Sequence, residues 1–63
     1  MIDHGVRVLS TALRRGVHLT LEDAMQITGL SESMARQALR VLERRNQAVR
    51  VDDQWIGAGD ACV

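Results

Sequence analysis

The sequence predicts a single, mainly α domain of the α+β class, with three helices and a short sheet of two to three strands. Apolar residues recur at helical spacing until about residue 46 and then alternate with polar ones, as they do in strands. A chain of 63 residues has room for one core. Phe and Tyr are absent and Trp55 is the only aromatic residue, so the core is predicted to be aliphatic.

The first helix is predicted from Asp3 to the residues before Gly16. Asp3 is a suitable N-cap, and behind it Val6, Leu9 and Leu13 follow the spacing of three and four that places side chains on one helix face. Gly16 supplies the left-handed conformation that commonly ends a helix. The result is an amphipathic helix of about three turns.

A short strand and a second helix are predicted to follow. Residues 17–19 have an apolar, polar, apolar order and are expected to form the third strand of the sheet. Thr20 then caps the second helix, with Asp23 reaching back to form a capping box, and Gly29 ends that helix. Its predicted buried side consists of Leu21, Ala24, Met25 and Ile27.

The third helix is predicted from the cap Ser31 to about Asn46, with Leu30 turned inward before it. Its apolar positions are spaced i, i+3, i+4 and i+7 and should form one buried face: Ala35, Ala38, Leu39 and Leu42. At 100° per residue, the opposite face carries Ser33, Arg36, Gln37, Arg40 and Arg44. The two closely spaced caps therefore predict a tight helix-turn-helix.

A short hairpin is predicted after residue 47, and its turn length decides where Trp55 lies. A two-residue turn at Asp52 and Asp53 places Arg50 directly across from Trp55, where the two side chains can form a cation–π pair or Trp55 can anchor a subunit interface. A three-residue loop would instead bury Trp55 against Val51. We expect Trp55 to be at least partly buried, a domain over residues 1–56, and a disordered tail over residues 57–63.

Residues 24–42, AMQITGLSESMARQALRVL, resemble the helix-turn-helix of winged helix-turn-helix transcriptional regulators. The matching positions are a small residue on the second helix, a Gly and an aliphatic residue in the turn, a Ser cap and spaced aliphatics: Ala24, Gly29, Leu30, Ser31, Ala35, Leu39 and Leu42. The resemblance covers Val6 to Ile56 and implies that the third helix enters the DNA major groove. The sequence departs from that family at Asn46, where a glycine is common, and at the acidic hairpin tip, which phosphates would repel.

The sequence has 8 arginines, no lysine and 8 acidic residues, so its formal net charge is zero, yet four arginines fall within residues 36–45. The residues predicted to bind DNA are Ser31, Ser33, Arg36, Gln37, Arg40 and Arg44. The alternative for Arg36 and Arg40 is a solvated helix face, with Glu32 and Arg36 paired at i, i+4. Arg44 and Arg45 are also accounted for by the helix dipole, which favours positive charge at this end.

No catalytic, metal-binding or cofactor-binding pattern is found. Glu22 and Asp23 are adjacent and diverge on a helix, His4 and His18 share no ligand spacing with Cys62, and no glycine-rich loop is present. We therefore assign no enzyme activity. With no apolar run long enough to span a bilayer and no signal peptide pattern, we expect a cytoplasmic protein.

Two functions are compatible with these observations. The first is a sequence-specific regulator that binds double-stranded DNA through residues 31–46 and acts as a homodimer, since one small domain offers little contact area. Trp55 and Arg50, on the hairpin, are the predicted interface residues. The second is an adaptor module that binds protein, because this fold also serves that purpose. The zero net charge and the acidic hairpin tip favour the second.

Overall fold

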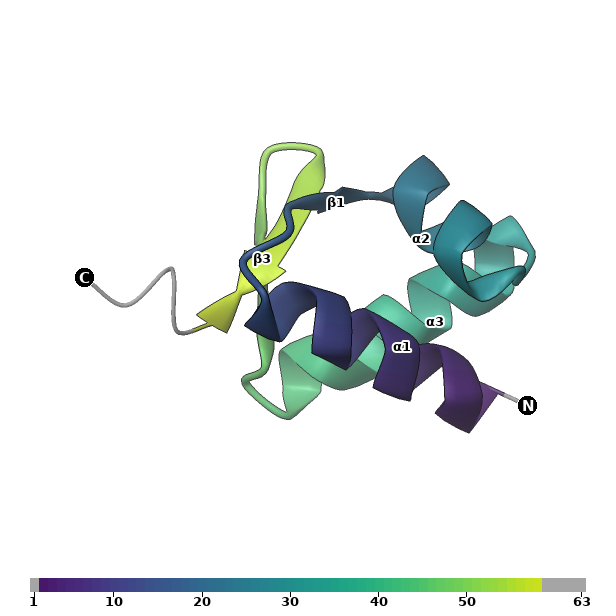
Figure 1. Cartoon of the computed structure of the whole chain (residues 1–63), viewed down its shortest axis with the longest axis horizontal. Coiled ribbons are helices and arrows are strands. Elements are labelled where there is room, and N and C mark those ends of the chain that lie inside the picture. The colour runs from purple at the N-terminus through teal and green to yellow at the C-terminus, as the bar shows by residue number, and fades with distance from the viewer. Residues whose placement is uncertain (1, 59–63) are drawn as a thin grey trace.

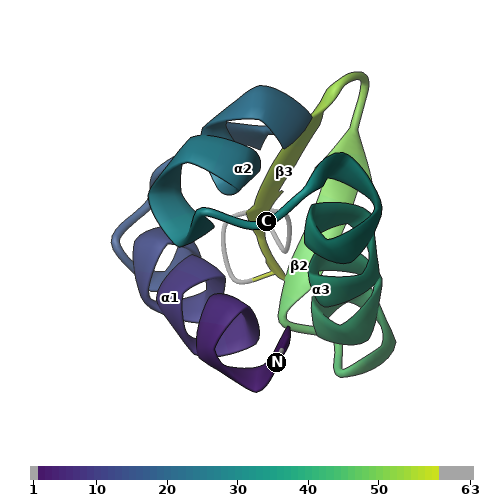
Figure 2. The same ribbon diagram turned by 90° about the vertical axis from the view of Figure 1, so that its right-hand side faces the viewer.

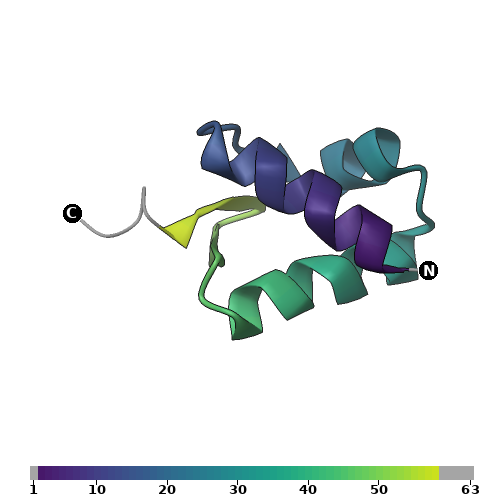
Figure 3. The ribbon, with the colours of Figure 1, turned by 60° about the horizontal axis from the view of Figure 1, so that its bottom comes forward.

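The computed structural model describes residues 2–58 and has the predicted α+β architecture. The elements, in chain order, are α1 (Ile2–Arg14), β1 (Leu19–Thr20), α2 (Leu21–Thr28), α3 (Glu32–Arg44), β2 (Ala48–Val51) and β3 (Gln54–Gly57). The strands form one antiparallel sheet in the order β1-β3-β2. Figure 3 shows α1 and α3 lying one above the other, with the hairpin beside the C-terminal end of α3.

The core lies where the three helices and the inner face of the sheet meet. Leu9, Leu19, Leu39 and Leu42 are the largest fully buried side chains, so the aliphatic core expected from the composition is confirmed. Viewed along the helices, α1 and α2 lie on one side and α3 on the other, with β2 and β3 behind them (Figure 2). Gly5 on α1 leaves room for the side chain of Leu30, because a Cβ at Gly5 would lie 2.6 Å from Leu30 Cδ1.

Local signals in the sequence set most element boundaries. Thr20 Oγ1 accepts from the Asp23 amide and Asp23 Oδ2 accepts from the Thr20 amide, both at 3.2 Å, so the predicted capping box is present. Gly16 and Gly29 have φ angles of 81° and 72°, and Asn46 has a φ of 58°, so all three take the left-handed conformation at helix ends. Figure 1 shows the resulting direct passage from β1 into α2.

Several predicted boundaries are corrected. Asp3 lies in the first turn of α1, which begins at Ile2, so Asp3 is not its N-cap. The first strand is Leu19–Thr20 and not residues 17–19, because only Leu19 and Thr20 pair with β3. Helix α3 ends at Arg44, two residues before Asn46. β3 continues to the buried Gly57, so the domain does not stop at residue 56; residues 59–63 of the expected tail lie outside the described residues.

The buried side of α2 is also corrected. Ala24 is fully buried with Leu21 and Met25 packed against the core, but Ile27 is 46% exposed. Ile27 lies roughly 110° around the helix from the middle of the arc that Leu21, Ala24 and Met25 define. Thr28 fills that arc instead, and its hydroxyl donates to the Ala24 carbonyl at 2.6 Å.

The hairpin has the two-residue turn at Asp52 and Asp53. Arg50 pairs with Trp55 and Val51 with Gln54, so the three-residue loop is wrong. Partial burial of Trp55 is nevertheless confirmed, because the face shared by Arg50 and Trp55 is the one that packs toward the core. Within residues 2–58, no helix has the length and apolar character needed to cross a membrane.

Candidate functional site

The solvent-facing side of α3, together with its N-cap Ser31, carries the predicted DNA-binding set. The opposite side of α3 is completely buried, with four residues that are each 0% exposed: Ala35, Ala38, Leu39 and Leu42. The side chains on the open side are all exposed: Ser31, Ser33, Arg36, Gln37, Arg40 and Arg44. A helix with one wholly buried apolar face therefore presents long hydrogen-bond donors to solvent.

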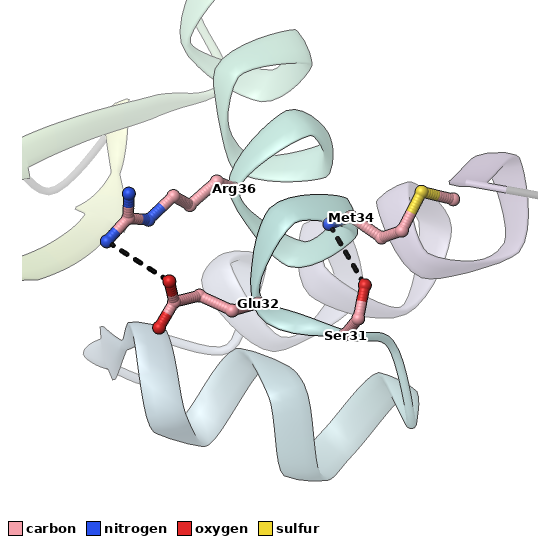
Figure 4. A network of polar contacts seen from close by, with 4 residues as sticks. All are labelled: Ser31, Glu32, Met34 and Arg36. Atoms are coloured by element: carbon pink, nitrogen blue, oxygen red, sulfur yellow. Dashed lines mark hydrogen bonds and ion pairs between the residues drawn. The ribbon is translucent and has the colours of Figure 1, made fainter.

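Ser31 is engaged in capping α3. Its Oγ accepts from the Met34 amide at 3.4 Å, as Figure 4 shows at the start of the helix. One free amide in the first turn of α3 is thus satisfied by the cap, and the Ser31 side chain stays exposed. The positive end of the helix dipole points out at the same place.

Arg36 is paired only weakly. Its Nη2 lies 3.6 Å from Glu32 Oε2, with both side chains 62% exposed (Figure 4). An exposed i, i+4 pair of this kind contributes a few tenths of a kcal/mol, about 0.3–0.5. Arg36 can therefore leave Glu32 for a stronger acceptor, such as a phosphate or a guanine edge, at little cost.

A cleft lies between α3 and the hairpin. It has a volume of about 570 Å³ and is lined by Leu21, Arg36, Arg40, Glu43, Arg50, Asp53 and Trp55. Three guanidinium groups and two carboxylates meet there, so the lining carries one net positive charge although the chain as a whole carries none. Arg40 and Arg44 also line a shallower depression with Glu43, farther along α3.

Trp55 fixes the hairpin side of the cleft. Its indole Nε1 donates to Glu43 Oε1 at 2.5 Å, which ties β3 to the last turn of α3. The Arg50 guanidinium lies 5.7 Å from the centroid of the indole ring, within cation–π range, and its Nε donates to the Asp52 carbonyl at 3.1 Å. The side chain of Arg50 is therefore held over the ring beside Arg36 and Arg40.

The structure thus divides the predicted residues into two groups. It brings Arg36 and Arg40 together with Arg50 and Trp55 in one cleft, although the sequence assigned the second pair to a subunit interface. Ser33 and Gln37 lie on the exposed face of α3 outside the lining of that cleft. The interface role of Arg50 and Trp55 stays a prediction.

Glu43 is the site residue that sequence reasoning missed. It belongs to the last turn of α3, and its partner Trp55 is 12 residues away on another element. A pairing between a helix and a later strand leaves no periodic pattern along the chain, so only the fold reveals it.

Comparisons of the chain with protein-family models, with curated proteins and with solved structures find no match.

Proposed function

We propose that this protein binds double-stranded DNA in a sequence-specific manner and regulates transcription, with α3 inserted in the major groove. The observation that carries the proposal is the two-sided character of α3, which buries only apolar residues and exposes only polar ones on the opposite side. A major groove about 12 Å wide admits one helix, and the guanidinium fork of Arg36 or Arg40 matches the two acceptors of guanine.

The neighbouring elements support the same placement. Three residues connect α2 to α3, and a hairpin follows α3, as expected for a winged helix-turn-helix. Arg50 lines the same cleft as Arg40, and we assign it a contact with a phosphate beside the groove that α3 would occupy. Asp52 and Asp53 at the tip would be repelled by phosphates, so the contact is assigned to Arg50 and not to the turn.

Binding to a protein partner is the second candidate. It is favoured by the zero net charge of the chain and by the two carboxylates in the cleft, Glu43 and Asp53. Both features weaken the attraction to nucleic acid at long range, and neither affects docking against a protein surface of mixed charge.

Fluorescence anisotropy of a labelled pool of duplex DNA, titrated with protein at low and moderate salt, separates the two candidates. Each arginine that contacts a phosphate, Arg50 first among them, should add about −0.9 to the slope of log affinity against log salt concentration, so DNA binding should weaken as salt rises. Absence of binding by a folded sample at both salt concentrations would favour the protein-binding candidate.

The variant Arg40→Ala locates the DNA surface, and Arg14→Ala is its matched control. Both arginines are exposed, so each substitution should change the free energy of unfolding by less than about 0.5 kcal/mol. Loss of a base contact by Arg40→Ala should weaken specific binding by about 1–3 kcal/mol. Arg14 is on α1 and its variant should bind as the wild type does. Equal binding by both variants would remove α3 from the interface.

A further inference from the structure

Strand β2 is an edge of the sheet. It pairs with β3 alone, and β3 is paired on its other side with β1. The Ala58 amide donates to the Gln47 carbonyl at 3.2 Å, which shows that residue 47 faces β3. Since backbone groups alternate in direction along an antiparallel strand, Val49 and Val51 also face β3, and the N–H and C=O groups of Ala48 and Arg50 point away from it. The described residues 2–58 contain no backbone hydrogen bond to those outward groups from outside the sheet.

The outer face of the hairpin carries three apolar side chains beside the exposed Gln54, which pairs with Val51. Val49 is 37% exposed and Val51 is 47% exposed, and their neighbour Ile56 is only half buried. The helices cover the other face, where Leu19, Ala48 and Trp55 lie. An unpaired edge beside exposed valines is a template for pairing with another strand.

We propose that β2 pairs with β2 of a second copy, antiparallel, about a two-fold axis at Val49. In this register Ala48 of each copy exchanges backbone hydrogen bonds with Arg50 of the other, so the outward groups of both residues are satisfied. Val49 then lies against Val49 of the second copy, and the outer faces of the two hairpins become one continuous face with the valines at its centre. The two three-stranded sheets become one sheet of six strands.

The competing registers are disfavoured by the residues themselves. Hydrogen bonding requires that outward-pointing residues oppose each other, so the other symmetric choices are centred on Arg50 or on Ala48. Centring on Arg50 places two guanidinium groups directly opposite on one face, which is unfavourable. Centring on Ala48 overlaps the two β2 strands at Ala48 alone, whereas centring on Val49 overlaps them over residues 48–50. The register about Val49 sets the small Ala48 beside each Arg50 instead.

Charge complementarity also selects a second copy as the partner. In the register about Val49, Asp52 lies across from Asn46 of the second copy, so the acidic tip reaches the end of its α3. Arg44 and Arg45 are exposed at that end. Two acids of one copy therefore approach two arginines of the other, twice, because the interface is symmetric. The acidic turn that disfavours DNA contact has a partner in this arrangement.

A cysteine placed on the two-fold axis tests the register. Val49→Cys in a Cys62→Ser background should form a disulfide-linked dimer under mild oxidation, because directly opposed residues of a non-hydrogen-bonded pair have Cα atoms about 4.5 Å apart. Val51→Cys in the same background is the control. Its two copies would lie roughly 13 Å apart along the strands and should stay monomeric. Equal cross-linking of both variants, or of neither, would overturn the proposal.

Sedimentation equilibrium without DNA tests the dimer independently of the proposed function. The wild-type chain should show twice its monomer mass of 7.0 kDa at millimolar concentration. Val49→Glu should be monomeric because it opposes two carboxylates at the axis, whereas Val17→Glu, at a site with similar exposure of 43%, should remain dimeric. A monomeric wild type, or a dimer that persists in Val49→Glu with native circular dichroism, would contradict the proposed pairing. DNA binding by α3 is measured separately and stands or falls on its own.

Discussion

Helix α3 and the β2–β3 hairpin follow each other in the chain but use their apolar residues differently. Ala35, Ala38, Leu39 and Leu42 of α3 are completely buried, whereas Val49 and Val51 of the hairpin are exposed. A helix gathers its apolar positions into one stripe that a single core can cover, but a sheet covered on one side leaves its other face in water. Packing within one chain therefore accounts for all the apolar positions on the buried face of α3, but for the apolar residues on only one face of the hairpin.

The largest difference should appear when an aliphatic side chain is truncated in each region. Leu39→Ala creates a cavity at a position that is 0% exposed and should lower the free energy of unfolding by about 2–5 kcal/mol. Val51→Ala removes a side chain that is 47% exposed and should cost less than about 0.5 kcal/mol. Urea denaturation followed by circular dichroism, at a concentration where the chain is monomeric, measures both.

A domain of this size has only a few kcal/mol of stability, roughly 3–9 by its length, so Leu39→Ala is expected to unfold much of the population. The comparison between helix and hairpin would fail if the two truncations had equal effects. That result would mean that the outer face of the hairpin is covered within one chain.

The next effect concerns the contact that joins the two regions. Glu43→Ala removes the acceptor of the Trp55 indole and should lower the free energy of unfolding by about 1 kcal/mol, since the pair is only partly buried. Glu43→Gln keeps an amide oxygen at the same place and should recover most of the loss. Thermal denaturation measures the stability, and the emission of Trp55 reports its surroundings. Unchanged stability and emission in Glu43→Ala would mean that the hairpin is held by the core alone.

The cap of α3 should have a smaller effect. Ser31→Ala removes the acceptor of the Met34 amide and should cost about 0.5–1 kcal/mol, the low end for a cap because the bond is long at 3.4 Å. Ser31→Asp restores an acceptor and adds a negative charge at the positive end of the helix dipole, so it should recover the stability. Thermal denaturation of the pair would show no difference if water caps the helix equally well.

The smallest effect is expected at the hairpin turn. Asp52 has a φ of 55°, a left-handed conformation that an Asp adopts with some strain. Asp52→Gly removes the strain but adds freedom to the unfolded chain, a cost of roughly 0.5–1 kcal/mol, so a slight gain in stability is expected. Urea denaturation measures it. A clear loss would indicate that the Asp52 side chain itself stabilises the turn.

Features that depend on neighbouring residues were predictable from the sequence. The capping box of Thr20 and Asp23, the left-handed Gly29 and the buried face of α3 follow from local hydrogen bonding and helical period. The exposed residues of the candidate site followed as well, because the face opposite a buried stripe must be exposed. The sequence could therefore predict which α3 side chains are exposed to solvent, but not which residues of other elements they contact.

Features that depend on contacts between elements were not predictable. The apolar character of Ile27 suggested that it belongs to the buried side of α2, but the arc of this eight-residue helix that is covered depends on α1 and α3. The side of the sheet on which Trp55 lies depended on turn length, and both lengths suited the sequence. The cleft exists only because α3 and the hairpin pack against each other in one relative orientation, which no local pattern specifies. The hydrogen bond that joins them, from Trp55 to Glu43, connects residues 12 positions apart.

Thr20 has two structural roles, since it pairs with Gln54 as the last residue of β1 and caps α2 with its hydroxyl. No linker separates strand from helix, so the two cannot detach from each other without losing both sets of bonds. The sheet and α2 should therefore open as one cooperative unit in hydrogen exchange. This junction should also tolerate insertions poorly, because one added residue would turn Leu19 out of the core or move Thr20 off the helix end.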